Sequence, residues 1–221
     1  MSDSEFIECI TSGKADAARR AMQTDPTLAV VQDDRGVSVL MLALYYDRQE
    51  IARNILTHRG ELDLWEASAL GDEGEVTILV SADLTLVDRF SPDGFTALSL
   101  AAFFGQKSVV KILLTNGADV NLPSRNQMNV RPIHSAAAHR DPETGLAILK
   151  TLLSYGAEVN VSQQEGWTPL HQAAAHGSRS MVRLLLQYGA DSSAKNKDGK
   201  TARDIARDPG HIEVERLLPP S

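Results

Sequence analysis

Several features that would direct a functional assignment are scarce in this sequence. Cysteine occurs once, as Cys9, which excludes a disulfide framework and a cysteine-rich metal site. No apolar run is long enough to cross a membrane, and residues 1–5 lack the basic and apolar regions of a secretory signal. We therefore expect a cytoplasmic protein that does not engage a membrane.

Positive charge is also in short supply. The 22 Lys and Arg residues are outnumbered by 29 Asp and Glu residues, which gives a net charge of −7. Such a chain repels a phosphate backbone, so a nucleic-acid partner is disfavoured. The sequence contains no H-E-x-x-H, G-x-S-x-G, G-x-G-x-x-G or phosphate-loop motif. We therefore expect no catalytic residue, no cofactor and no metal, and hence a protein that is not an enzyme.

What the sequence does contain is a repeated pattern. Residues 165–191 indicate a turn, a short helix, a tight turn, a longer helix and a final turn. Pro169 suits the first position of the short helix, and Gly177 suits the tight turn that follows it. Related copies begin near residues 93 and 132, and positions equivalent to Pro169 recur 33 to 37 residues apart. One such unit cannot bury its own apolar face, so the copies must stack.

In these copies the chain resembles the ankyrin repeat family, in which a T-P-L-H-x-A motif recurs about every 33 residues. The resemblance implies an all-α fold: an ankyrin-repeat solenoid of stacked helix-turn-helix units with projecting β-turn fingers. We expect a single domain over residues 1–221 with about seven units, including caps. The expected units are 2–33 (the N-terminal cap), 34–61, 62–92, 93–127, 128–164, 165–197 and 198–218 (the C-terminal cap).

Some irregularities accompany the pattern. The helix expected at 64–70 follows the preceding unit so early that its finger should be missing, which should leave a gap in the row of fingers. The finger at 122–127 and the inter-helix turn at 139–145 are longer than their counterparts. At the start of the chain, Ser2 and Glu5 have the spacing of a capping box.

The few aromatic residues are concentrated at particular positions. The chain has two Trp, four Tyr and five Phe, and six of these either follow a turn glycine or end a first helix. In ankyrin arrays, the resemblance implies, these positions line the concave groove that contacts partners. Together with equivalent positions in other units, the predicted partner-binding residues are Tyr45, Tyr46, Leu70, Phe95, Phe103, Phe104, His139, Trp167 and His176. The alternative is that the rings cover the short helices and bind nothing.

Four histidines occupy two kinds of position in the units. His134 and His171 stand at the motif histidine, which by resemblance hydrogen-bonds the backbone of a neighbouring turn. His139 and His176 have equivalent positions in adjacent units and should project from the same surface. Neighbouring units stand about 10 Å apart, too far for two ligands of one metal ion.

Three further residues have a structural interpretation. Cys9 takes the place of a small buried residue. Asn121 and Asn160 resemble the site that an asparaginyl hydroxylase modifies in some animal ankyrin proteins. Hydrogen bonding within turns is the better interpretation of both asparagines.

The leading hypothesis is a monomeric, non-catalytic protein–protein interaction module that binds a protein or peptide in a preorganised groove. Acidic residues near the groove and the fingers favour a basic rim on the partner: Asp47, Asp72, Asp93 and Glu165. Two alternatives stay open. One is a small-ligand or enzymatic site outside known motifs, for example near residues 140–145, and the other is a scaffold that self-associates through the aromatic stripe.

Overall fold

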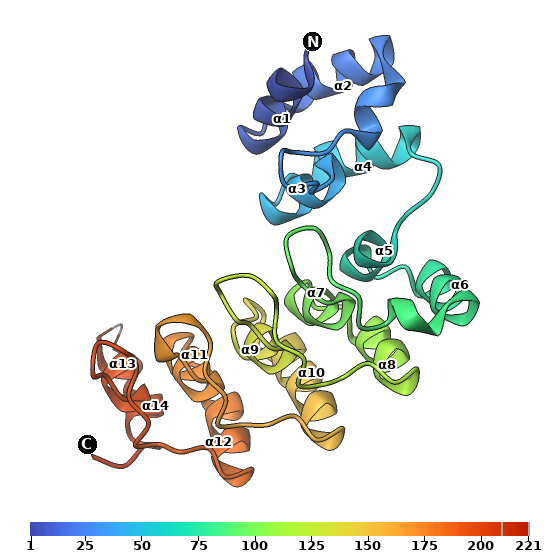
Figure 1. The fold of residues 1–221 in the computed structure, drawn as a ribbon. Coiled ribbons are helices and arrows are strands. Elements are labelled where there is room, and N and C mark those ends of the chain that lie inside the picture. The colour runs from blue at the N-terminus through green and yellow to red at the C-terminus, as the bar shows by residue number, and fades with distance from the viewer. Residues whose placement is uncertain (209, 221) are drawn as a thin grey trace.

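The structure is a computed structural model and describes residues 1–208 and 210–220. These residues form fourteen α-helices and three short 3-10 helices, and their only β pairing is two isolated bridges, Gln32 with Ser38 and Phe90 with Thr96. Consecutive α-helices pair into units that stack in a curved array, with the termini at opposite ends (Figure 1). The all-helical solenoid predicted from the sequence is confirmed.

The helix bounds follow the repeat. The first two units contain α1 (Asp3–Thr11), α2 (Ala15–Thr24), η1 (Pro26–Val30), α3 (Val39–Tyr45) and α4 (Gln49–His58). The next two contain α5 (Leu64–Leu70), α6 (Glu73–Ala82), η2 (Leu84–Leu86), α7 (Ala97–Phe103) and α8 (Lys107–Thr115). The last three contain α9 (Pro132–Ala137), α10 (Pro142–Ser154), η3 (Gln164–Gly166), α11 (Pro169–Ala175), α12 (Arg179–Gln187), α13 (Ala202–Arg207) and α14 (Ile212–Glu215).

Local sequence explains where the helices begin. The hydroxyls of Ser38, Thr96 and Thr168 accept hydrogen bonds from the first-turn amides of α3, α7 and α11. The capping box predicted at Ser2 and Glu5 is present and starts α1. The first helix of each pair lies on the inside of the curve and the second on the outside (Figure 1).

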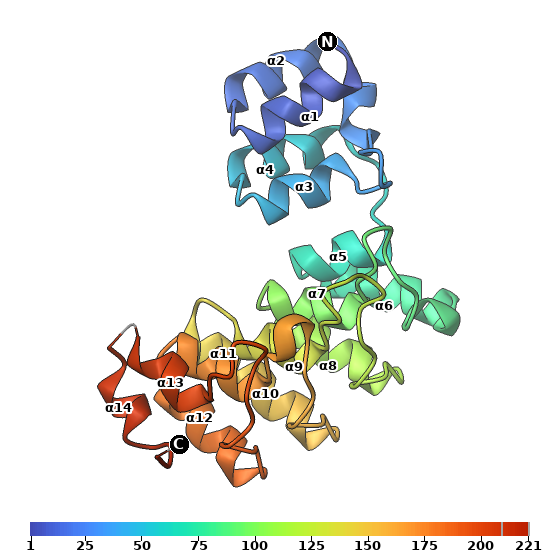
Figure 2. The same ribbon diagram turned by 60° about the vertical axis from the view of Figure 1, so that its left-hand side comes forward.

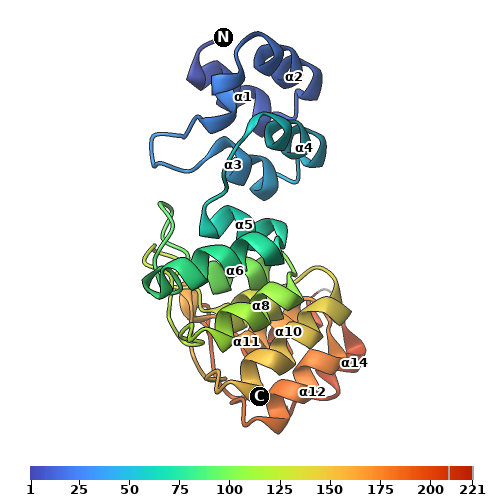
Figure 3. The same cartoon turned by 90° about the vertical axis from the view of Figure 1, so that its right-hand side faces the viewer.

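The buried apolar side chains form two clusters. One comes from the first two units, from Phe6 to Ile55, with Ala69 and Leu100 added. The other runs from Leu64 to Leu218. We call residues 1–58 the N-terminal block, residues 64–220 the C-terminal block and residues 59–63 the linker. The inner helices α3 and α5 pack together across the junction, whereas the outer helices α4 and α6 lie well apart (Figures 2 and 3).

The expected gap in the row of fingers is wrong. The finger ahead of α5 is indeed absent, because the linker leads directly into that helix. The next finger, residues 90–96, takes its place: Pro92 Cβ lies 3.3 Å from where a Cβ would stand on Gly36, in the finger of residues 32–38. The fingers therefore form one row that skips the unit of α5 and α6.

The long turn expected at 139–145 is also corrected. The extra residues form an additional turn at the start of α10, which has 13 residues, with Pro142 in its first turn and Asp141 as its N-cap. Gly145 permits this extension, because a Cβ there would lie 2.7 Å from the Ala136 carbonyl oxygen. The long finger is confirmed, since Ser124 pairs with Val130 rather than with a residue four positions on.

Candidate partner-binding surface

A cluster of aromatic rings lies where the two blocks meet. The Tyr45 and Phe104 rings stack with centroids 5.8 Å apart, and the Phe103 ring meets Phe104 edge-on at 5.1 Å. The Tyr45 hydroxyl donates a hydrogen bond to Asp93 Oδ2 at 2.7 Å, and this bond connects the finger of residues 90–96 to the end of α3. Burial, and then the charge of Asp93, raises the pKa of Tyr45 and keeps its hydroxyl protonated.

The predicted groove residues near this seam differ in exposure. Tyr46 and Phe103 project into solvent, with 50% and 53% of their surface exposed. The other four are half-buried and pack against the cluster of the N-terminal block: Tyr45, Leu70, Phe95 and Phe104. Each of the two interpretations of the aromatic residues thus applies to some of them. Tyr45, Phe95 and Phe104 cover the short helices, whereas Tyr46 and Phe103 remain free to contact a partner.

Trp167, His139 and His176 lie in later units. The half-buried Trp167 ring faces the His171 ring of its own unit at 6.0 Å. His176 is the exposed C-cap of α11. The shorter α9 ends at Ala137 with Ala138 as its C-cap, so His139 comes after the cap. The structure therefore gathers the residues near the seam and places His139 beside Gly105, the residue after Phe104, whereas Trp167 and His176 belong to the following unit.

The expected equivalence of His139 and His176 is wrong. The half-buried His139 packs over the preceding unit's turn, where a Cβ on Gly105 would lie 2.6 Å from its Nε2. His211 occupies the comparable place over Gly177, and its Nε2 bonds the Ala175 carbonyl at 3.1 Å. Burial, and then the charge of His211, lowers the pKa of His176. Within the described part of the chain, no three His, Cys, Asp or Glu side chains are grouped to hold a metal ion.

The motif histidines have the structural role that the resemblance implies. His134 Nδ1 accepts the Arg131 amide at 3.2 Å, so its Nε2–H donates to the Val161 carbonyl at 3.3 Å. Burial lowers the pKa of His134 to about 4, which keeps the ring neutral. His171 repeats this arrangement, with Nδ1 bonded to Thr168 and Nε2–H to the Lys200 carbonyl at 3.1 Å, and burial lowers its pKa as well.

The hairpin asparagines bridge successive units. Asn121 Nδ2 donates to the Gly156 carbonyl at 3.1 Å, and its Oδ1 accepts the Glu158 amide at 2.9 Å. Asn160 makes the same pair of bonds one unit later, with Gly189 and Asp191. The predicted turn bonding is confirmed, as is the burial of Cys9.

A buried charge cluster at the junction is not among the predicted site residues. Glu66 is fully buried, and its carboxylate accepts from Ser38 Oγ at 2.5 Å and from Arg59 Nη2 at 2.6 Å. Burial, and then the nearby charge of Asp63, raises the pKa of Glu66 despite these bonds. The sequence carries one sign of the cluster, because Asp63 and Glu66 have the spacing of a capping box, and both of its bonds are present.

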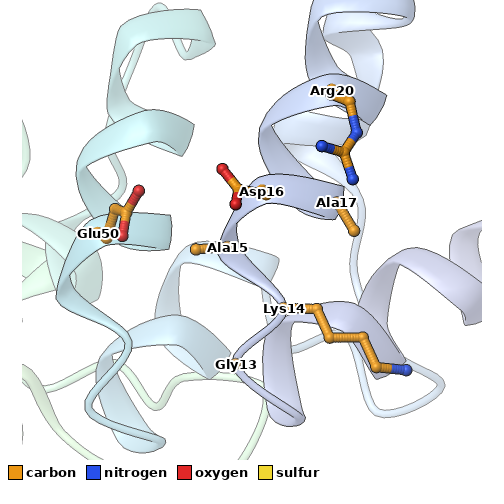
Figure 4. A pocket seen from close by; sticks show the side chains of 7 residues that line it. All are labelled: Gly13, Lys14, Ala15, Asp16, Ala17, Arg20 and Glu50. Atoms are coloured by element: carbon orange, nitrogen blue, oxygen red, sulfur yellow. The ribbon is translucent and has the colours of Figure 1, made fainter.

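One hollow of about 450 Å³ lies at the turn between α1 and α2, on the N-terminal block. Figure 4 shows Lys14 and Arg20 on one side of it and Asp16 and Glu50 on the other. Lys14 already lies 3.6 Å from Glu8, and Glu50 lies 3.8 Å from Arg19. A site with this mixed and partly paired charge does not select an ion of either sign, so we assign no ligand to it.

Comparison with known proteins decides the family. The family model for ankyrin repeats, which describes three copies of the repeat, matches residues 64–161 and 133–219. The chain belongs to the ankyrin repeat family. The match begins at the first residue of α5, so the more divergent N-terminal block lies outside it.

The relatives are diverse. The chain is 33% identical to a transient receptor potential cation channel subfamily A member 1 homolog of Caenorhabditis elegans, over 72% of this chain and 12% of that protein. It is 29% identical to the putative ankyrin repeat protein YahD of Escherichia coli, over 66% of this chain and 88% of YahD. It is 39% identical to mouse ankyrin repeat domain-containing protein 37, over 49% of this chain and 65% of that protein. The matches to the channel homolog and to the Drosophila kinase Shark span only 12% and 16% of those proteins.

Ankyrin repeats generally serve as protein–protein interaction modules, and the family is generally non-enzymatic. Among the helices that the structure describes, none is long and apolar enough to cross a membrane.

Proposed function

We propose that this protein is a non-catalytic interaction module that binds a protein or peptide partner through the concave side of the array. The observation that carries the proposal is the exposure of Tyr46 and Phe103, at 50% and 53%, beside the ordered rings of Tyr45 and Phe104. Large aromatic side chains that stay exposed on a fixed backbone suit an interface anchor, because little ordering is needed on binding.

The charge around these rings favours a basic partner. Asp47 follows Tyr46 at the end of α3, and Asp72 begins the neighbouring α6. Of the cations nearby, Arg48 donates to the Thr11 carbonyl at 2.9 Å and is half-buried over the first turn, and Lys107 lines a small hollow with Glu73. A Lys- or Arg-containing segment with an apolar side chain between the anchors would complement this edge. We propose a monomer that acts in the cytoplasm, without nucleic acid or membrane.

Matched aromatic variants test the proposal. Tyr46→Ser with Phe103→Ser removes the groove anchors, whereas Tyr155→Ser with Tyr188→Ser removes two rings of similar exposure, 45% and 51%, at the ends of α10 and α12. Both variants should keep the wild-type circular dichroism, because all four side chains are about half exposed and none belongs to a buried cluster. A partner captured from lysate is then purified and titrated against each protein.

The groove variant should raise the partner's Kd at least tenfold, and the control variant should leave it unchanged. An unchanged Kd for the groove variant would exclude these anchors, and a loss confined to the control variant would place binding on the outer helices. If the anchors instead drive self-association, light scattering will give a mass that rises with concentration for the wild type alone. A melting temperature raised by a metabolite, with no protein captured, would favour a small-ligand site.

A further inference from the structure

The two blocks are joined differently from the units within the C-terminal block. From α7 onward, each finger is hydrogen-bonded to the next through the backbone: Arg125 N–H donates to Gly94 O, Gln164 N–H to Met128 O and Lys197 N–H to Glu165 O, at 2.8 to 2.9 Å. In each case the donor directly follows the residue that opens the finger.

At the junction, this donor is replaced by a proline. Ser91 opens its finger by pairing with Phe95, as Ser124 does with Val130, so Pro92 stands where Arg125 stands in the next finger. Proline has no amide hydrogen, and the Pro92 ring lies beside Gly36, where an added Cβ would stand 3.3 Å from Pro92 Cβ. Of the described backbone groups, none bonds one of these two fingers to the other.

The side-chain hydrogen bonds that link successive units at the base of the fingers are also missing at this junction. Asp88 Oδ1 accepts the Asp119 amide at 2.9 Å, and Asn121 and Asn160 continue the series. The position equivalent to Asp88 in the N-terminal block is Val30, an exposed apolar residue that cannot bridge. The linker supplies a single substitute, from Arg59 Nη1 to the Ala29 carbonyl at 3.3 Å.

Two kinds of contact remain on the inner side of the junction. Apolar side chains such as Leu70 and Phe104 pack against the cluster of the N-terminal block, and a polar latch lies beside them. We define the latch as Ser38, Arg59 and Glu66, with Tyr45 and Asp93 beside it. The bonds of the latch are directional and depend on ionised groups, whereas the bonds between the later fingers are made by backbone amides and carbonyls. Because α4 and α6 lie apart, the outer side of the junction lacks the close helix pairing that α6 makes with α8 and α8 with α10 (Figures 1 and 3).

We infer that the linker is a hinge, about which the N-terminal block rotates against the C-terminal block when the latch opens. Opening draws Tyr45 away from Phe104 and Asp93, so it alters the aromatic seam that the proposed partner would contact. The inference does not rest on the proposed function, because it concerns the free protein. Such motion between two packed bodies requires only a few element-terminal residues to change conformation.

Distances between spin labels test the hinge. In a Cys9→Ala background, Cys replaces Glu50, Ser108 or Ser180, exposed residues that each stand second in α4, α8 or α12. The pair 50/108 spans the junction, and the matched pair 108/180 spans the same number of units within the C-terminal block. Double electron–electron resonance then gives the distance distribution of each pair.

The junction pair should have a distribution at least twice as wide as the control pair. Glu66→Ala should widen it further, and Pro92→Ala, which restores an amide donor, should narrow it, both without changing the control pair. Equal widths for the two pairs would overturn the hinge, as would a junction width that neither variant moves. The Pro92→Ala variant keeps the test decisive if Glu66→Ala fails to fold.

Discussion

From α7 to α14, packed helices, bonded fingers and side-chain bridges together join each unit to the next. The two units of α1 to α4 instead meet the rest of the array through α3, one linker, a charge cluster and a few apolar side chains such as Leu70 and Phe104. The N-terminal block has its own apolar cluster, but two units are fewer than a repeat array needs to be stable alone. Its stability should therefore depend on the seam, where a few polar groups act beside the aromatic and apolar contacts.

The largest effect should come from breaking the latch. Arg59→Ala leaves the fully buried Glu66 without its cation and should cost about 3 to 5 kcal/mol of unfolding free energy. Urea unfolding followed by circular dichroism measures the loss. Arg35→Ala is the control, because its pair with Asp33 is mostly exposed on the arginine side and should contribute less than about 1 kcal/mol. Equal losses for the two variants would contradict the role of the latch.

A core truncation should separate the two blocks. Leu40→Ala, in the N-terminal cluster, should destabilise that block by about 3 kcal/mol. Trp65 packs against both clusters, so the test uses a Trp65→Phe background in which Trp167 alone reports on the C-terminal block. Its fluorescence should keep its midpoint while circular dichroism gains an earlier transition. Leu149→Ala, buried in the other cluster, should instead lower the fluorescence midpoint. Coincident transitions in both variants would show that the array unfolds as one body.

Acid should weaken the C-terminal block through His134. The pKa of His134 falls from 6.5 to about 4 on burial, so the unfolded chain binds the extra proton between these values. The stability that the neutral His134 ring gives to the folded state is complete above pH 6.5 and is lost as the pH falls toward 4. For a pKa shift of this size, the loss in unfolding free energy is about 2 to 3 kcal/mol.

His134→Asn should reduce that pH dependence, measured as urea midpoints from pH 7 to pH 4. The raised pKa of Glu66 acts with the opposite sign, because the folded junction holds its proton more tightly and loses stability as the pH rises through that pKa. A variant with the wild-type slope would show that His134 does not titrate as described.

The smallest effect should come from one bridge between units. Asn160→Ala removes two bonds to the following unit and should cost about 1 kcal/mol, since each is solvent-exposed. Ser154→Ala, whose hydroxyl bonds only its own helix, should stay within about 0.5 kcal/mol of the wild type. Thermal unfolding of the two variants measures this difference. Equal melting temperatures would show that the two Asn160 bonds contribute nothing to stability.

The sequence predicts the repeated parts of the molecule well. The helix start at Pro169, the histidine bonds to neighbouring turns and the turn bonding of the hairpin asparagines all follow from local motifs that recur with the unit. Two local predictions fail because of tertiary packing. The extra residues near Pro142 extend a helix because Gly145 leaves room for it, and the finger at Pro92 reaches across a unit to Gly36.

The candidate surface is predicted less completely. Position in the motif places Tyr45, Tyr46, Phe103 and Phe104 at the ends of first helices, but it does not tell which rings stay exposed. The exposure of each ring depends on where α5 packs and on contacts between distant residues, such as Tyr45 with Asp93. Glu66 escapes prediction for the same reason, since its partner Ser38 lies 28 residues away in another unit.

Hydrogen exchange of the intact protein, resolved by peptide with mass spectrometry, tests the central claim most directly. If the blocks are separately stabilised, amides of α1 to α4 should exchange together at a lower opening free energy than those of α7 to α12, with the change at residues 59–63. A single level of protection across the linker would contradict the account, because it would mean that the latch joins the two blocks as firmly as the bonded fingers join the other units.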